Sequence, residues 1–134
     1  VELRYEDVPT WLKRIYHRYD FEMNLNYFYQ LPDPVLGVHR HYGTDQIRKG
    51  THFVNSSRYS NPDLDALLDS GAGEPNAAKR TAAYREIQQI LANDMPVVNL
   101  FELEFLVVYN TKLKGAYGSA MGAYGSFREA WLDD

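Results

Sequence analysis

The first thirty residues alternate between two hydrophobic periods, and this pattern limits the folds open to the chain. Residues 1–6 alternate apolar and charged side chains, which is typical of a half-buried strand. Apolar residues at helical spacing follow over residues 9–19, and period 2 returns over residues 21–29. Strand, helix and strand within this length predict a βαβ unit, whose two strands run parallel in one sheet. We therefore expect an α/β fold.

Capping signals predict two helices in the middle of the chain. Asn61-Pro62 supplies an N-cap followed by proline at the first helical position, and the glycines at 71 and 73 end this helix. Pro75 is expected to open a longer helix that ends at Met95, because a residue before proline disfavours the α conformation. We further expect a short helix over residues 36–42, one or two strands over 97–109, a turn at 111–115 and a terminal helical turn over 127–132.

Composition excludes several classes of protein. The 134 residues suffice for one compact domain, and a net charge of −4 gives no basic surface for nucleic acid. The longest apolar run, residues 105–109, is far too short to span a membrane. Cysteine is absent, so disulfides and thiolate zinc sites are excluded. The chain opens at Val1 inside an expected strand, so we expect a mature or truncated chain rather than a complete protein.

Several segments, in order along the chain, carry a resemblance to a known family. Residues 20–29 (DFEMNLNYFY) precede an Asp-Pro dipeptide, and residues 59–68 (YSNPDLDALL) match Y-x-N-P-x-x-D-x-L-L. Residues 79–96 match K-R-x3-Y-x3-Q-x2-L-x4-P, and the dipeptides at 109–110 and 114–115 match the end of the strand that follows. In this order and spacing they resemble the family 5 extracellular solute-binding proteins of ABC transporters, which include oligopeptide- and dipeptide-binding proteins.

The resemblance implies an architecture and a function. Complete members of this family are several-fold longer, and their two lobes close on a ligand. Residues 1–112 would belong to the C-terminal lobe of a type II periplasmic-binding-protein-like fold, and residues 113–134 would return towards the N-terminal lobe. The protein would capture peptides or similar small solutes at the periplasmic or extracellular face and deliver them to ABC permease subunits. It would need no cofactor, no metal and no catalytic residue, and the remaining part of the two-lobed protein would be its partner.

The bend after the second expected strand is the candidate binding site. The carboxyl end of a strand in an open α/β sheet is where ligands bind, and aromatic faces there bury apolar ligand surface. On the residues alone, Tyr27 and Tyr29 are favoured as core residues of a one-sided strand, whereas core and binding roles are balanced for Phe28 and Gln30. The family's equivalent loop faces the cleft. The resemblance therefore implies substrate contacts from Tyr27, Phe28, Tyr29, Gln30, Leu31 and Asp33.

One departure from the family pattern affects the expected ligand. Dipeptide- and oligopeptide-binding members often carry an acidic residue in this loop, which pairs with the amino terminus of the peptide. This chain has Gln30 instead, so recognition of a free amine is in doubt. Asp33 is an alternative partner for an amine, although its place before Pro34 favours a helix cap.

Other chemistry-bearing residues have plainer interpretations. His39 and His41 point apart on a helix, and His17 and His52 are expected to be isolated surface residues, so no metal site is predicted. Two copies of G-A-Y-G-S, at 115–119 and 122–126, favour linker structure over ligand contact. No nucleophile–base pair with the spacing of a hydrolase is present. The alternative to solute capture is a self-contained interaction domain that binds a protein partner through its aromatic residues.

Overall fold

The computed structural model describes residues 2–104, 106–116 and 125–133. These residues form helices and one small two-stranded sheet, a mixed content that is compatible with an α/β class. The chain divides into two compact units, Val1–Val98 and Asn99–Asp134. Among the described residues, all helices belong to the first unit and the sheet belongs to the second. The assignment of residues 1–112 and 113–134 to parts of a two-lobed protein stays a prediction.

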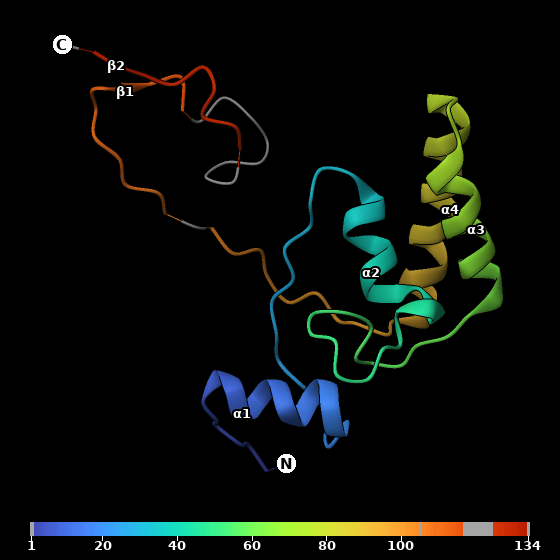
Figure 1. Cartoon of the computed structure of the whole chain (residues 1–134). Coiled ribbons are helices and arrows are strands. Elements are labelled where there is room, and N and C mark those ends of the chain that lie inside the picture. Colours follow the sequence, from blue (N-terminus) through green and yellow to red (C-terminus); the bar gives the residue numbers. More distant parts are fainter. Residues whose placement is uncertain (1, 105, 117–124, 134) are drawn as a thin grey trace. The chain divides into compact units, whose positions relative to one another are not determined.

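The N-terminal helix forms where the hydrophobic pattern predicts it. Helix α1 spans Val8–Leu12 and continues directly into a π-helical turn, η1, over Lys13–Arg18. Asp7 caps the start, because its carboxylate accepts a hydrogen bond of 2.8 Å from the backbone N–H of Thr10. Tyr19 ends the helix in the left-handed conformation, with φ 54°. Figure 1 shows α1 and η1 as one coil beside the N-terminus.

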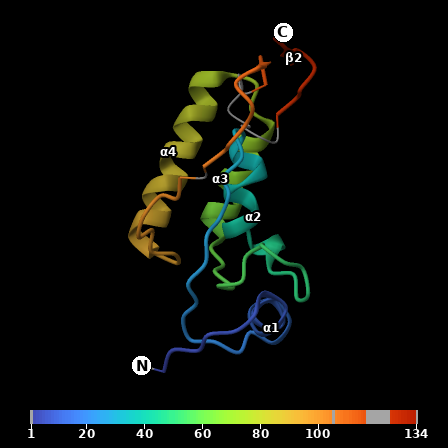
Figure 2. The ribbon, with the colours of Figure 1, turned by 90° about the vertical axis from the view of Figure 1, so that its left-hand side faces the viewer.

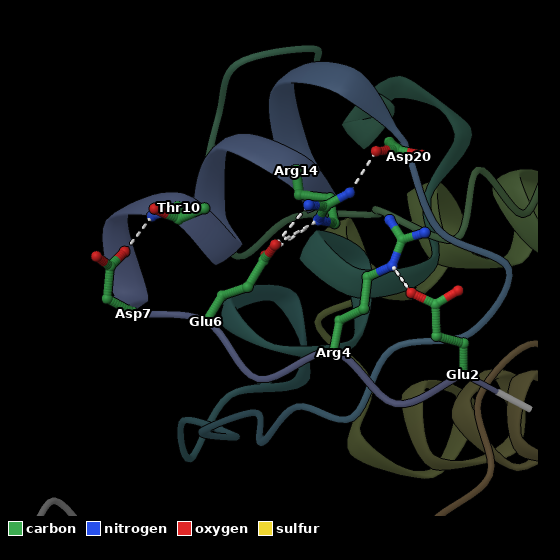
Figure 3. Close-up of polar contacts among 7 residues, drawn as sticks. All are labelled: Glu2, Arg4, Glu6, Asp7, Thr10, Arg14 and Asp20. Atoms are coloured by element: carbon green, nitrogen blue, oxygen red, sulfur yellow. Dashed lines mark hydrogen bonds and ion pairs between the residues drawn. The ribbon is translucent and has the colours of Figure 1, made fainter.

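Arg14 ties the segments on both sides of this helix together. Its Nε donates to the two carboxylate oxygens of Glu6 at 2.9 and 3.0 Å, and its Nη1 contacts the carboxylate of Asp20. Figure 3 shows the guanidinium between these two carboxylates. The Arg14 hydrogen bond holds the pKa of Glu6 below its ordinary value. The segment before the helix and the segment after it are therefore both held by the guanidinium of Arg14.

A first hydrophobic cluster joins η1 to a loop more than thirty residues later in the chain. The rings of Trp11 and Tyr16 meet edge to face, with centroids 5.9 Å apart. The backbone N–H of Gly50 donates to the carbonyl of Tyr16 at 2.8 Å, so the loop is held at its start as well. The buried members are Ile15, Tyr16 and Val54, with Trp11, Leu12 and Phe21 packed against them.

Helices α3 (Pro62–Gly73) and α4 (Ala77–Asp94) lie side by side, as both ribbon views show (Figures 1 and 2). The second hydrophobic cluster of the chain lies between these two helices, and its buried members are Leu64, Leu68 and Ile87. The predicted Asn61 cap and the predicted end at Met95 are confirmed. Pro75 does not open α4. The helix begins two residues later, because the carboxamide of Asn76 accepts from the backbone N–H groups of residues 78 and 79.

The expected short helix over 36–42 is confirmed as two pieces. A 3-10 turn, η2 (Pro34–Leu36), precedes α2 (Val38–Tyr42), and Gly37 between them leaves the helical conformation with ψ −67° and φ −124°. A further 3-10 turn, η3 (Thr44–Gln46), follows in the stretch expected to be irregular. Val38 and Tyr42 pack against the second cluster, so α2 rests on the α3–α4 pair.

The predicted βαβ unit is wrong for the described residues. The helix is present, but residues 2–7 and 21–29 form no sheet ladder. Residues 20–33 lead from η1 to η2 without a helix or a ladder (Figure 1). A strand needs a neighbour for its N–H and C=O groups, and period 2 in the sequence does not supply one. The strands expected over 97–109 fail in the same way, since residues 97–104 and 106–109 carry no ladder.

The second unit contains the sheet. β1 (Leu113–Lys114) pairs antiparallel with β2 (Trp131–Leu132), with Leu113 opposite Leu132. The helical turn expected over 127–132 is therefore wrong. Gly115 is required at its place, because it has φ +67° and an added Cβ would lie 2.5 Å from the carbonyl oxygen of Glu129. The tyrosines of the two G-A-Y-G-S copies, Tyr117 and Tyr124, lie outside the described residues, so the linker structure expected there stays a prediction.

Candidate functional site

The six predicted site residues lie on the chain that leads from the first cluster into η2 and α2. Phe28 turns towards α2, where its ring lies 3.9 Å from the ring of His41, centroid to centroid, at an interplanar angle of 38°. Tyr27 and Tyr29, on either side of it in the chain, are 57% and 36% exposed. The favoured expectation that these two tyrosines are core residues is therefore wrong. In an extended chain successive side chains alternate, so one anchored ring leaves its two neighbours at the surface.

Gln30 continues the anchoring of the bend. Its carboxamide nitrogen lies 3.2 Å from Nδ1 of His41. A carboxamide nitrogen only donates, so Nδ1 accepts and the proton of the neutral imidazole sits on Nε2. His41 is 3% exposed, and burial followed by the charge of Arg40 lowers its pKa to about 4. The ring is therefore neutral at physiological pH and serves as a support for Phe28 and Gln30.

Two further contacts hold the backbone of the bend against α2. Arg40 donates from Nη2 to the carbonyl of Tyr29 at 3.3 Å. Gly37 is buried beneath Gln30, and a Cβ built on it would lie 2.0 Å from Oε1 of that side chain. The absence of a side chain at position 37 lets Gln30 reach His41. The bend is thus held by side-chain stacking, a side-chain hydrogen bond and a backbone hydrogen bond.

Asp33 has the role of a cap. Its Oδ1 accepts from the backbone N–H of Val35 at 2.9 Å, which begins η2. Both of its carboxylate oxygens also accept from Nη2 of Arg80, at 2.8 and 3.1 Å. The hydrogen bond from Val35, and then that from Arg80, hold the pKa of Asp33 below its ordinary value. The predicted cap is confirmed, and an incoming amine would have to compete with the Arg80 guanidinium for this carboxylate.

Arg80 extends this contact to the turn between α3 and α4. Its Nε donates to the carbonyl of Gly71 at 3.1 Å, and its guanidinium lies 5.5 Å from the centroid of the Tyr84 ring. An open depression lies between η2 and the α3–α4 connection, beside the ion pair. It is lined by Asp33, Val35, Leu36, Ala72, Gly73, Glu74, Pro75 and Arg80.

The structure adds three supporting residues that the sequence did not assign to this site: Arg40, His41 and Arg80. Each acts on a residue at least eleven positions away, and no local spacing signal exists for such contacts. Leu31, the remaining predicted contact, is half-buried beside the bend. Whether the six predicted residues touch a solute stays a prediction.

The histidines are arranged differently from the expectation. His39 lies 3.4 Å from the Tyr84 hydroxyl, and burial lowers its pKa. His17 and His52, expected to be isolated, meet with their Nε2 atoms 3.2 Å apart. Among the described residues, no group of three or more His, Cys, Asp or Glu side chains is placed to hold a metal ion. In the same part of the chain, every helix is too short or too polar to cross a bilayer.

Comparison with known proteins gives two partial matches. The chain is 36% identical over 66 residues to Protein XP55 of Streptomyces lividans, and 23% identical over 70 residues to the peptide transport periplasmic protein SapA of Haemophilus influenzae. These alignments cover 49% and 52% of this chain but only 12% of each relative. No family model matches the chain, and no solved structure gives a significant match. The chain thus has a distant, partial link to a periplasmic peptide-transport protein.

Proposed function

We propose that this chain is part of the C-terminal lobe of a solute-binding protein of family 5, which captures peptides or similar small solutes for an ABC importer. The order of sequence motifs along the chain and the partial similarity to SapA support this assignment. The protein works at the periplasmic or extracellular face, binds its solute without catalysing a reaction, and passes it to permease subunits. The opposite wall of the cleft belongs to the rest of the protein, and closure by hinge bending buries the solute.

The observation that carries the proposal is the asymmetric anchoring of the aromatic bend. Phe28 and Gln30 fix it to the buried ring of His41, while Tyr27 and Tyr29 are exposed. Rings on a fixed backbone lose little conformational freedom when a ligand covers them, so they contribute apolar contact area at low entropic cost. A pre-formed aromatic wall with few polar groups is suited to solutes that differ in their side chains.

The polar groups beside this wall favour recognition without a free amine. Gln30 is neutral and engaged with His41, and the carboxylate of Asp33 is already shared between Val35 and Arg80. A peptide amine therefore finds no unengaged carboxylate among these residues. We expect a peptide with a blocked amino terminus to bind within a few-fold of the same peptide with a free amine.

The test is a solute screen on the complete protein that contains this chain. Thermal shift would identify a binding peptide or small solute, and calorimetry would then measure its affinity for three proteins: the wild type, Tyr27→Ala with Tyr29→Ala, and Tyr5→Ala. Tyr5 is 90% exposed but lies outside the bend, so it controls for the loss of an exposed tyrosine. We expect the double variant to lose at least tenfold in affinity and the control to keep it.

The isolated 134-residue chain provides the complementary measurement. Because one wall of the cleft is missing, we expect peptides to bind it weakly or not at all. Micromolar affinity for the isolated chain would contradict the two-lobed assignment, and unchanged affinity in the double tyrosine variant would remove the bend from the site. A protein ligand bound by the isolated chain through these tyrosines would instead support the self-contained interaction domain.

A further inference from the structure

We propose that His17 and His52 form a two-histidine site for a divalent transition-metal ion such as Zn²⁺. The two Nε2 atoms face each other at 3.2 Å, and the ring centroids lie 5.4 Å apart at an interplanar angle of 56°. The residues are 35 positions apart in sequence. Both side chains are exposed, so an ion can reach the pair from solvent.

The separation of the two nitrogens suits a shared metal ion. Zinc binds imidazole nitrogen at about 2.0–2.1 Å, so two nitrogens on one tetrahedral ion lie about 3.3–3.4 Å apart. The observed 3.2 Å differs from this by only tenths of an ångström. Without metal, one Nε2–H donates to the other Nε2. With metal, that proton moves through solvent to Nδ1 of the same ring, so that both Nε2 lone pairs point at the ion.

Packing holds the pair in place before any ion binds. His17 lies in the π-helical turn η1, a conformation that is frequent at functional sites. His52 is positioned by the loop that Gly50 attaches to the carbonyl of Tyr16, and the ring of His52 lies 5.8 Å from that of Tyr16. The buried cluster of Tyr16 and Val54 fixes both elements. The backbone of both elements is therefore fixed before a metal binds, so binding has to order only the two side chains.

The surroundings predict an exchangeable ion rather than a permanent one. The pair sits at an open depression that is lined by Pro9, Thr10, Leu12, Lys13, His17 and His52. Lys13 also lines this depression, and its positive charge disfavours a second cation there. No third His, Cys, Asp or Glu completes the site among the described residues, so water would have to fill the remaining positions on a bound ion. An open, two-ligand site of this kind binds reversibly, unlike the closed four-ligand sites that stabilise folds.

The test is calorimetry of the purified protein, with every affinity tag removed, titrated with ZnCl₂ at pH 7.5. We expect one zinc ion per chain, and at least tenfold weaker binding at this site in His17→Ala and in His52→Ala. Lys13→Gln keeps both rings and removes the nearby charge, so it should bind at least as tightly as the wild type.

A second measurement shows where the ion binds. In ¹⁵N spectra of the imidazoles, zinc should shift Nε2 of His17 and of His52 together and leave His39 unchanged. No zinc binding, or equal binding in the two alanine variants and the wild type, would overturn the proposal. The Tyr27→Ala, Tyr29→Ala double variant separates this site from solute capture, because it should lose solute and keep zinc affinity.

Discussion

At the scale of single residues, the main supporting side chain of the candidate site is a buried neutral histidine. His41 stacks on Phe28 and accepts a hydrogen bond from Gln30. The two influences on its pKa are burial and the charge of Arg40, and neither is a carboxylate that would stabilise the imidazolium. Burial and the neighbouring Arg40 both disfavour the imidazolium, which lowers the pKa from 6.5 to about 4. The unfolded chain has no such penalty. Protonation of His41 therefore favours unfolding.

This pKa shift predicts a loss of stability in mild acid. Between pH 6.5 and pH 4 the unfolded chain binds a proton at residue 41 that the folded chain does not, so the free energy of unfolding falls as the pH is lowered through this window. The lowered pKa of His41 should reduce the free energy of unfolding by about 3 kcal/mol in all, and this loss is nearly complete at pH 4. Urea unfolding at pH 7.5, 6 and 5 would measure the slope for the wild type, His41→Gln and His39→Gln.

The two variants separate the buried ring from its neighbour on α2. His41→Gln cannot titrate, so most of the slope should disappear even if the variant is less stable at every pH. The pKa of His39 is lowered too, with opposing contributions from three aspartates, so His39→Gln should keep the larger part of the slope. A slope that survives unchanged in His41→Gln would show that residue 41 is not the titrating group.

At the scale of elements, the α3–α4 pair is tied together at one end by a cap that serves two helices. Oδ1 of Asn61 accepts from the backbone N–H groups of Asp63 and Leu64 at 3.0 and 3.2 Å. Its Nδ2 also donates to Asp94, the last residue of α4, at 3.1 Å. The Tyr59 hydroxyl donates to the same carboxylate; burial, and then this contact, raise the pKa of Tyr59 to about 12. The start of α3 and the end of α4 therefore share one hydrogen-bonded group.

Two asparagine caps give a matched pair of variants. Asn76→Ala removes only the N-cap of α4 and should cost about 1 kcal/mol of unfolding free energy. Asn61→Ala removes the cap of α3 and the link to Asp94, so it should cost more, on the order of 2 kcal/mol. Urea unfolding of both variants at pH 7.5 measures the difference. An equal cost would show that the link between the two helix ends adds nothing to stability.

The same elements show which features the sequence could predict. The start of α3 was predictable because Asn61 caps backbone groups two and three residues ahead, which is a local signal. The start of α4 was misplaced because Pro75 was taken as its first residue, whereas Asn76 is the cap. Strand pairing was not predictable, since hydrophobic alternation over residues 21–29 says nothing of a partner.

The candidate site shows the same limit. The aromatic bend and the Asp33 cap could be read from neighbouring residues. The anchoring of Phe28 on His41, and the meeting of His17 with His52, depend on contacts between residues that are distant in sequence. No periodicity or capping pattern encodes such contacts.

At the scale of the whole molecule, two extended stretches carry large apolar side chains that are exposed. One is residues 21–29 in the first unit, and the other is residues 99–104 and 106–110 in the second. Neither forms a sheet ladder among the described residues. Exposed apolar surface of this extent is unusual for a monomeric globular protein. A segment rich in strand-forming residues tends to pair with a sheet edge where one is available. The exposed members include Met23, Leu25, Leu100, Phe101, Leu106 and Val108.

Under the proposed function these stretches are strands whose partners lie in the rest of the two-lobed protein, and hydrogen exchange can test this directly. In the isolated 134-residue chain, backbone amides of residues 21–29 and 106–110 should exchange at nearly unprotected rates, because no hydrogen bonds of a sheet protect them there. In the complete protein the same amides should be protected many-fold. Helices α3 and α4 are the internal control, since their amides are bonded within the helix and should be protected in both samples. If the two stretches exchanged as fast in the complete protein as in the isolated chain, no sheet would form on them. The aromatic bend would then lack the strand that the two-lobed assignment places before it.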